Sequence, residues 1–250
     1  MRSNPFFCLI LGLVSTPILA QSSISFSQTG ETVATPGSPF QAERISRTSH
    51  TLSDGNQILQ EQHETIARDS QGRFYDESKQ TSSGGIPKDQ PNVFHVLIDP
   101  VAMTSTSWNT LSNNGNVQHL SPTTHVVVGA TQGLGDNATR HLRGDDIKIT
   151  TEDLGKKTIA GLPCTGVRTT TTIPVARIGN AHPIKLVSDR WTSADLQMTV
   201  LEVDDDPLNG TRTSEFTTVS RTEPPASLFK VPEGLNLRNP MIGGIAPTTR

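Results

Sequence analysis

Arg190 and Trp191 are the residues whose types and spacing best suit ligand binding. They follow Asp189 at the end of a β-prone run, and an arginine beside a tryptophan can bind a ligand by charge or by stacking. In the alternative interpretation, Trp191 covers the core at a strand end and Arg190 pairs with Glu77 or Asp189. We favour this simpler alternative and keep Arg190 and Trp191 as the ligand-binding candidates.

A glycine-rich segment at 126–135 resembles the phosphate-binding turn of short-chain dehydrogenases. Tyr75 and Lys79 even have the spacing of the catalytic pair in that family. Their order along the chain is reversed, however, because in that family the tyrosine comes long after the glycine-rich turn. No alternation of helices and strands follows the glycines either. We therefore interpret 126–135 as a loop after a short strand.

An acidic run, Glu202 with Asp204, Asp205 and Asp206, offers the oxygen ligands that calcium prefers. It lacks the glycine and the terminal glutamate of a known calcium loop, so we expect a solvated hairpin tip instead. The histidines are scattered singly, and none has a metal-ligand spacing such as His-x-x-x-His. We expect no metal and no other cofactor. The histidines are His50, His63, His95, His119, His125, His141 and His182.

The sequence has no local pattern of a hydrolase nucleophile on a tight strand-to-helix turn. A Ser/His/Asp set can be chosen from any serine-rich chain, so such a set has little weight. The formal net charge of −3 is too small to indicate a nucleic-acid partner. The sequence therefore predicts a protein that is not an enzyme and does not bind nucleic acid.

The first twenty residues have the pattern of a secretory signal peptide. Arg2 precedes a short apolar run at 6–14, and small residues lead to a cleavage site after Ala20. The alternative, a membrane anchor, requires a longer apolar run to cross a bilayer core of about 30 Å. We expect export to the periplasm or the extracellular space, and no transmembrane segment in the mature chain.

Cleavage at this site removes Cys8 and leaves Cys164 as the only cysteine, so we expect no internal disulfide. Cys164 then has two interpretations, a small buried hydrophobe or a reactive thiol. We favour the buried hydrophobe, because the residue lies in a β-prone segment without a partner.

The composition indicates one domain with a thin core. The chain has 250 residues, of which 33% are hydrophobic and 4% aromatic, and such a chain suits a single layer of sheet. We expect a disordered leader at 21–39, one β-domain at 40–234 and a flexible tail at 235–250. A polar insert at about 112–145 interrupts the domain.

Turn residues between β-prone runs, roughly ten residues apart, predict antiparallel hairpins. The stretch that organises the chain is 154–203, whose four consecutive threonines at 169–172 favour a pleated strand. There we expect a helical turn at 151–154, a strand at 154–161, a turn at 162–166 and a strand at 167–174. Further strands are expected at 40–52, 57–67, 73–79, 93–98, 101–111, 184–191, 196–203 and 211–221, with a short turn or helix at 224–229.

These elements predict an all-β fold, an antiparallel curved sheet or half-barrel meander with little helix. A two-sheet β-sandwich is the alternative. We expect the sheet over 154–221 to be the stability core and Trp191 to be its largest buried anchor. Trp108, beside the polar insert, should matter less.

Short motifs in a fixed order resemble a family of exported bacterial proteins of unknown function. They cover most of 40–234, and the segment at 112–145 departs from the pattern. The motifs are RDSQGR at 68–73, LG at 154–155, IAG at 159–161, GVRTT at 166–170, TIP at 172–174, IGN at 178–180, RWTS at 190–193, DP at 206–207, RTEP at 221–224 and LFKVP at 228–232.

More distantly, the chain looks like periplasmic domains whose curved sheet holds lipid or lipoprotein chains. This likeness implies a non-enzymatic envelope protein that binds an apolar, lipid-like or extended ligand. Two other functions stay open. One is a structural or interaction protein that uses its sheet edge, and the other is a hydrolase with an unfamiliar site.

Overall fold

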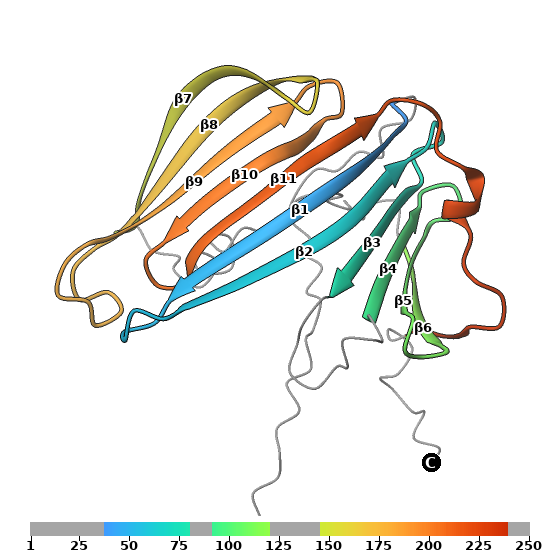
Figure 1. The fold of residues 1–250 in the computed structure, drawn as a ribbon, viewed down its shortest axis with the longest axis horizontal. Helices are drawn as coiled ribbons and strands as arrows, with labels where there is room; N and C mark the ends of the chain where they lie inside the picture. The colour runs from blue at the N-terminus through green and yellow to red at the C-terminus, as the bar shows by residue number, and fades with distance from the viewer. Residues whose placement is uncertain (1–37, 81–91, 121–145, 240–250) are drawn as a thin grey trace, which may run out of the picture.

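Twelve strands form one open, curved sheet in the computed structural model, which describes residues 38–80, 92–120 and 146–239 (Figure 1). The strand order is β12-β6-β5-β4-β3-β2-β1-β11-β10-β9-β8-β7, and all neighbours are antiparallel except β12 and β6. The predicted all-β class and the curved antiparallel sheet are confirmed, and the strands form one sheet rather than a sandwich. The predicted signal peptide and the glycine-rich segment at 126–135 lie outside the described residues.

Strands β1 to β6 are successive antiparallel neighbours, and so are β7 to β11; β1 and β11 pair to join the two groups. A short 3-10 helix, η1, follows β11. The bounds are β1 Phe40–Thr51, β2 Gln57–Arg68, β3 Phe74–Gln80, β4 Asn92–Asp99, β5 Thr104–Asn109, β6 Asn114–His119, β7 Lys148–Ile159, β8 Leu162–Ile173, β9 Ile184–Ser193, β10 Met198–Asp206, β11 Gly210–Ser220, η1 Ala226–Phe229 and β12 Asn236–Arg238.

Two of the turns between strands contain glycines with positive φ. Gly55 joins β1 to β2 at φ +84°, and Gly210 starts β11 at φ +96°. At Gly210 a Cβ would lie 2.1 Å from the backbone oxygen of Ser49, so a side chain has no room. Glycine is therefore required there both by the φ angle and by the close approach of β1.

The hairpin of β7 and β8 differs from the prediction. The turn is at Ala160 and Gly161, with φ of +47° and +79°, rather than at 162–166. Two consecutive positive φ angles are what a two-residue hairpin turn requires, and 162–166 can then pair with β7. The helical turn predicted at 151–154 is also wrong, because these residues belong to β7.

The polar insert and the tail also contain strands that the sequence did not predict. Asn114–His119 forms β6, which pairs with β5, and Asn236–Arg238 forms β12, which pairs with β6 in parallel. Both strands have largely exposed side chains, so neither shows an apolar pattern. Backbone pairing, which composition does not reveal, holds them in the sheet.

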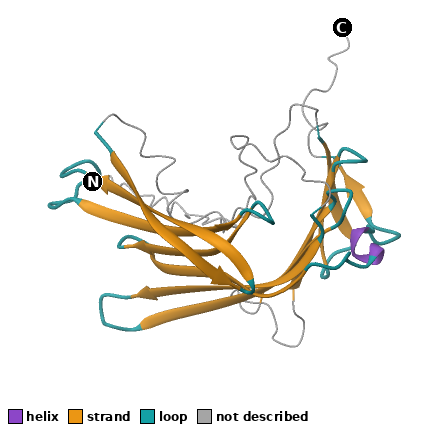
Figure 2. Cartoon of the chain, turned by 90° about the horizontal axis from the view of Figure 1, so that it is seen from above, coloured by secondary structure: helices purple, strands orange, loops and turns teal. Residues whose placement is uncertain are grey.

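The two faces of the sheet carry two separate hydrophobic clusters. Phe74 belongs to the first cluster and Tyr75 to the second, because successive side chains of a strand point to opposite faces. The second cluster includes Phe229 of η1, which lies on the outer side of the curved sheet (Figure 2). The members of the first cluster on β1 to β4 therefore lie on the concave face.

Irregular pairing at three places accompanies the curvature. The register shifts in β1 between Glu43 and Arg44, in β7 between Asp153 and Gly155, and in β10 between Thr199 and Leu201. Such bulges bend a strand and increase its twist. The first cluster joins residues of β1 to β4 with residues of β7, β8, β10 and β11, so the stability core extends beyond the predicted 154–221. Its buried members are Phe40, Ala42, Ile66, Phe74, Ile98, Ile159, Leu162, Cys164, Leu196, Met198, Val200 and Phe216.

Candidate functional site

Arg190 lies on β9 and pairs with Glu202 of β10, its direct cross-strand neighbour. Its Nε donates to Glu202 Oε1 at 2.7 Å. Neither of the partners predicted for Arg190 is the observed one. Asp189 accepts two hydrogen bonds from Arg168 at 2.6 and 2.7 Å, because the two are opposite each other on β8 and β9.

Trp191 points to the opposite face of the sheet from Arg190. Its ring lies over Gly166 of β8, where a Cβ would come within 2.7 Å of the ring. Lys157 of β7 places its Nζ 5.4 Å from the ring centroid, in cation–π geometry. A ligand on one face of the sheet can therefore contact Arg190 or Trp191 but not both.

The two tryptophans have the reverse of their predicted burial. Trp108 is 7% exposed in the outer cluster, whereas Trp191 is only partly buried and packs against the edge of the first cluster. The prediction that Trp191 is the largest buried anchor is wrong. Trp108 lies on β5, which is covered because β4 and β6 flank it and the η1 segment packs on the same cluster.

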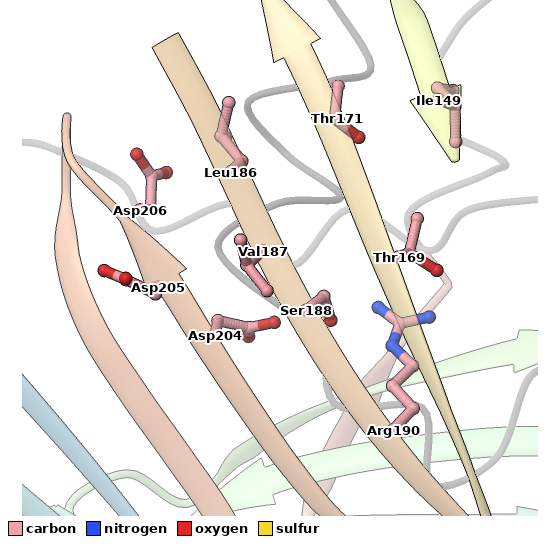
Figure 3. Close-up of a pocket in the computed structure, with 10 residues that line it drawn as sticks. All are labelled: Ile149, Thr169, Thr171, Leu186, Val187, Ser188, Arg190, Asp204, Asp205 and Asp206. Atoms are coloured by element: carbon pink, nitrogen blue, oxygen red, sulfur yellow. The ribbon is translucent and has the colours of Figure 1, made fainter. Parts of the chain in front are cut away.

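A pocket of about 190 Å³ opens beside Arg190 over β7 to β10 (Figure 3). Its wall carries the apolar side chains Ile149 and Leu186, and it also carries hydroxyls and carboxylates. The cross-strand pairs Arg190–Glu202, Glu202–Ser214 and Ser214–Ser46 connect this part of the sheet to β1 on the concave face. The remaining lining residues are Thr169, Thr171, Val187, Ser188, Asp204, Asp205 and Asp206.

The acidic run beside the pocket is not the solvated hairpin tip that was predicted. Glu202, Asp204 and Asp206 are 2%, 2% and 1% exposed, and only Asp205 is exposed. The strand β10 continues to Asp206, so its alternate side chains stay on the buried face. Asp206 accepts hydrogen bonds from the amide of Leu208 and from the side chain of Asn209, both at 2.8 Å. It thereby holds the turn into β11.

Asp204 is a buried carboxylate that faces the Ser188 hydroxyl, its direct neighbour on β9. Among the described residues, no hydrogen bond of standard geometry reaches either Asp204 oxygen or the Ser188 hydroxyl. Burial raises the pKa of Asp204, and the charge of Glu202 raises it further. The Ser188 hydroxyl and the charges of Arg212 and Arg190 oppose this rise. Figure 3 shows the Asp204 carboxylate directed from β10 toward Ser188.

A row of buried polar groups continues across the concave face to β3. Arg44 of β1 contacts Glu64 of β2 and, at 3.4 Å, Asp76 of β3. Burial alone would lower the pKa of Arg44, but Glu64, Asp76 and Glu202 outweigh it and raise the pKa. Burial raises the pKa of Asp76 to about 6, with repulsion from Glu64 added and attraction to Arg44 opposing it.

Tyr75 and Lys79, which have dehydrogenase-like spacing, lie on the outer face. The Tyr75 hydroxyl donates to Glu77 at 2.9 Å and lies 2.9 Å from His95 Nδ1. Burial and then Glu77 raise the pKa of Tyr75, while burial lowers the pKa of His95. His95 stacks on Trp108 with ring centroids 5.0 Å apart. The hydroxyl of Tyr75 is thus engaged within this aromatic cluster.

Cys164 is buried at 3% exposure on β8, as predicted, and burial raises the pKa of its thiol. Within the described ranges, no group of three or more His, Cys, Asp or Glu side chains could hold a metal ion. His125 and His141 lie outside those ranges. No helix in the described part of the chain is long and apolar enough to cross a membrane.

The buried carboxylates were missed although the sequence carried a signal for them. Along β10, Met198, Val200, Glu202, Asp204 and Asp206 are buried at every second position. Alternation of side chains along a strand extends to charged residues. The negative charge of the run suggested a solvated hairpin tip. Its residues are buried instead where they occupy the same alternate positions on the strand as Met198 and Val200.

No protein-family model matches the chain, and no curated protein matches it. Solved structures resemble it at low identity. The MucA/MucB complex of Pseudomonas aeruginosa has a TM-score of 0.42 at 9% identity, over 80% of this chain and 58% of that one. A LolA superfamily protein of Nitrosomonas europaea has a TM-score of 0.32 at 12% identity, over 79% and 92%.

A putative outer membrane lipoprotein-sorting protein domain of Vibrio parahaemolyticus has a TM-score of 0.30 at 6% identity, over 77% of this chain and 89% of that one. The chain spans less than two thirds of the length of the MucA/MucB structure. At these scores the likeness identifies no shared function, and the resemblance of the sequence motifs stays a prediction.

Proposed function

We propose that the chain is a non-enzymatic binding domain of the cell envelope, and that it holds an elongated ligand on the concave face of its open sheet. The observation that carries the proposal is the pocket beside Arg190, which combines the apolar walls of Ile149 and Leu186 with polar groups. Mixed apolar and polar lining is typical of ligand sites. The amino-terminal pattern of a signal peptide supports an envelope location.

The lining of the pocket supports binding rather than catalysis. Its one serine, Ser188, has no histidine or lysine among the lining residues to activate it. Asp206 is bonded to the turn and Glu202 is paired with Arg190, so two of the nearby carboxylates serve the structure. In this proposal Arg190 lies at the edge of the ligand site, and Trp191 supports the other face.

The free edge of β7 is less suited to binding by strand pairing. The strand lies at the end of the sheet order, and most of its side chains are exposed. It carries Lys156 and Lys157 beside a bulge at 153–155, and charged residues and bulges are devices that keep edge strands from pairing. This arrangement favours the concave face over the edge as the binding surface.

Native mass spectrometry of protein purified from its own host tests the proposal, with Thr169→Phe and Thr170→Phe as a matched pair. Thr169 lines the pocket, whereas Thr170 points to the other face of β8. We expect a bound molecule on wild type and on Thr170→Phe, and its loss from Thr169→Phe. Absence of any bound molecule, or equal retention in both variants, would contradict the proposal.

A further inference from the structure

The pocket contains buried oxygens that no hydrogen bond of standard geometry reaches in the described part of the chain. They are the two carboxylate oxygens of Asp204 and the hydroxyl oxygen of Ser188. The large majority of buried polar atoms in native structures are hydrogen-bonded. Asp204 has only the Ser188 hydroxyl facing it and the charges of Arg212 and Arg190 nearby, and these do not offset burial, because its pKa is still raised. A buried carboxylate with so few donors is costly to keep, because it has lost its hydration. Such a group lining an open pocket points to a ligand that supplies the donors.

Neighbouring carboxylates do not share this property. Glu202 is paired with Arg190, Asp206 is bonded within its turn, and Asp205 is exposed. Asp204 is therefore the one carboxylate lining the pocket that is both buried and without a hydrogen bond.

The kind of donor follows from the number and setting of these oxygens. An ammonium group presents three N–H donors from one atom, which matches three acceptor oxygens on neighbouring strands. A divalent cation requires more oxygen ligands, and the described residues contain no metal-binding group of three. The apolar walls formed by Ile149 and Leu186 suit the methylene groups of an aliphatic stem.

We infer that this pocket binds a primary ammonium group on an aliphatic stem, and that the group is a lysine side chain of an extended peptide. The inference rests on the proposed function and names the chemistry of its ligand. The peptide source is favoured over an aminophospholipid because a phosphate near the ammonium would face the carboxylate of Asp206, which lies on the same face as Asp204 at this pocket. A lysine side chain brings no such negative charge.

Calorimetric titration of the full exported chain with N-acetyl-lysine methylamide tests the inference. N-acetyl-norleucine methylamide, which has the stem without the ammonium, is the matched probe. We expect saturable binding of the lysine probe, at least about tenfold tighter than the norleucine probe. Equal affinity for the two probes, or no saturable binding of the lysine probe, would overturn the inference.

Asp204→Asn is the decisive variant, because it removes the charge and keeps the shape. We expect it to weaken lysine-probe binding at least about tenfold, while Asp205→Asn stays within about twofold of wild type. Ser188→Ala should weaken binding by a smaller factor. Circular dichroism and urea midpoints check that the variants are folded. Unchanged affinity in Asp204→Asn would refute the assigned site.

Two further measurements separate this inference from the proposed function. Vesicles of phosphatidylethanolamine that compete better than the lysine probe would refute the peptide source. A molecule that co-purifies with wild type, lacks an amine and is retained by Asp204→Asn would refute the ammonium site but leave the binding domain in place. Probe binding that depends on Asp204, without any co-purifying ligand, would support the site and contradict the broader proposal.

Discussion

The outer face of β3 to β5 and the concave face over β8 to β10 belong to one sheet. They differ in whether their buried polar groups are hydrogen-bonded. On the outer face, Tyr75 bonds with Glu77 and His95, and Phe229 of η1 joins the same cluster. On the concave face, Asp204 and Ser188 are buried without hydrogen bonds.

The difference separates structure from binding. A polar group that is covered by the chain and fully bonded helps to specify the fold. A buried polar group that lines an open pocket without a partner is destabilising for the fold, and it is retained where a ligand can satisfy it. We therefore interpret the outer face, which η1 covers, as the region that stabilises the fold. We interpret the pocket on the concave face as the region that binds a ligand.

The largest expected effect concerns the two tryptophans. Trp108→Ala should lower the free energy of unfolding by about 3–5 kcal/mol, because the ring is buried in the covered cluster. Trp191→Ala should cost about half as much, since its ring is only partly buried. Equilibrium urea unfolding of both variants measures the difference. Equal losses, or a larger loss for Trp191→Ala, would break the contrast between the faces.

Asp76→Asn tests the polar row of the concave face through pH. The pKa of Asp76 is about 6 in the folded chain, above its ordinary value of 3.8, so the folded state holds the extra proton between these values. Stability from this group is therefore present below about pH 4 and is lost as pH rises through 6. The Asn variant lacks this loss and should be more stable than wild type at pH 7, on the order of 2 kcal/mol.

Urea unfolding of wild type and Asp76→Asn at pH 4, 5, 6 and 7 measures the effect. The advantage of the variant should be small at pH 4 and should grow toward pH 7. A stability difference that does not change with pH would show that the pKa of Asp76 is not raised in the folded chain.

Tyr75→Phe removes one hydroxyl from the covered face and keeps the ring. We expect a loss of about 1–2 kcal/mol, because Glu77 and His95 lose a buried partner. Thermal and urea unfolding measure the loss. An unchanged midpoint would mean that the covered network contributes nothing to stability.

Asp204→Asn is expected to act in the opposite direction from Tyr75→Phe. Without ligand, removal of a buried carboxylate that lacks a hydrogen bond should raise the free energy of unfolding by about 1 kcal/mol. Asp205→Asn, one residue along on the exposed side, should change it by less than about 0.5 kcal/mol. Urea midpoints at pH 7 compare the three proteins. A lower midpoint for Asp204→Asn than for wild type would remove the contrast between the two regions.

Much of the strand pattern could be predicted from the sequence, because turn residues and β-branched runs act over only a few neighbouring residues. Turn residues at Gly55 and Gly210 mark hairpins, and β-branched runs such as 169–172 mark the strands between them. The burial of Cys164 follows from a small apolar residue in such a strand. Of the two predicted ligand-binding residues, Arg190 lines the pocket and Trp191 lies on the other face, and ligand binding by either stays a prediction.

Other features depended on contacts between distant segments. The polar strands β6 and β12 exist because each gains a neighbour in the sheet, which no pattern within their own residues reveals. The turn at Ala160 and Gly161 was not predicted, because the nearby segment Pro163–Gly166 contains a proline and a glycine, which are also typical turn residues.

The sequence by itself determined the all-β class and the hairpin order, because side-chain alternation and turn chemistry act over a few residues. Only the tertiary structure decided which tryptophan is buried and which carboxylate lacks a partner. Burial depends on what packs over a strand, and here η1 covers the outer face beside Trp108. The state of Asp204 likewise depends on β9 and β11, which bring Ser188 and Arg212 opposite it.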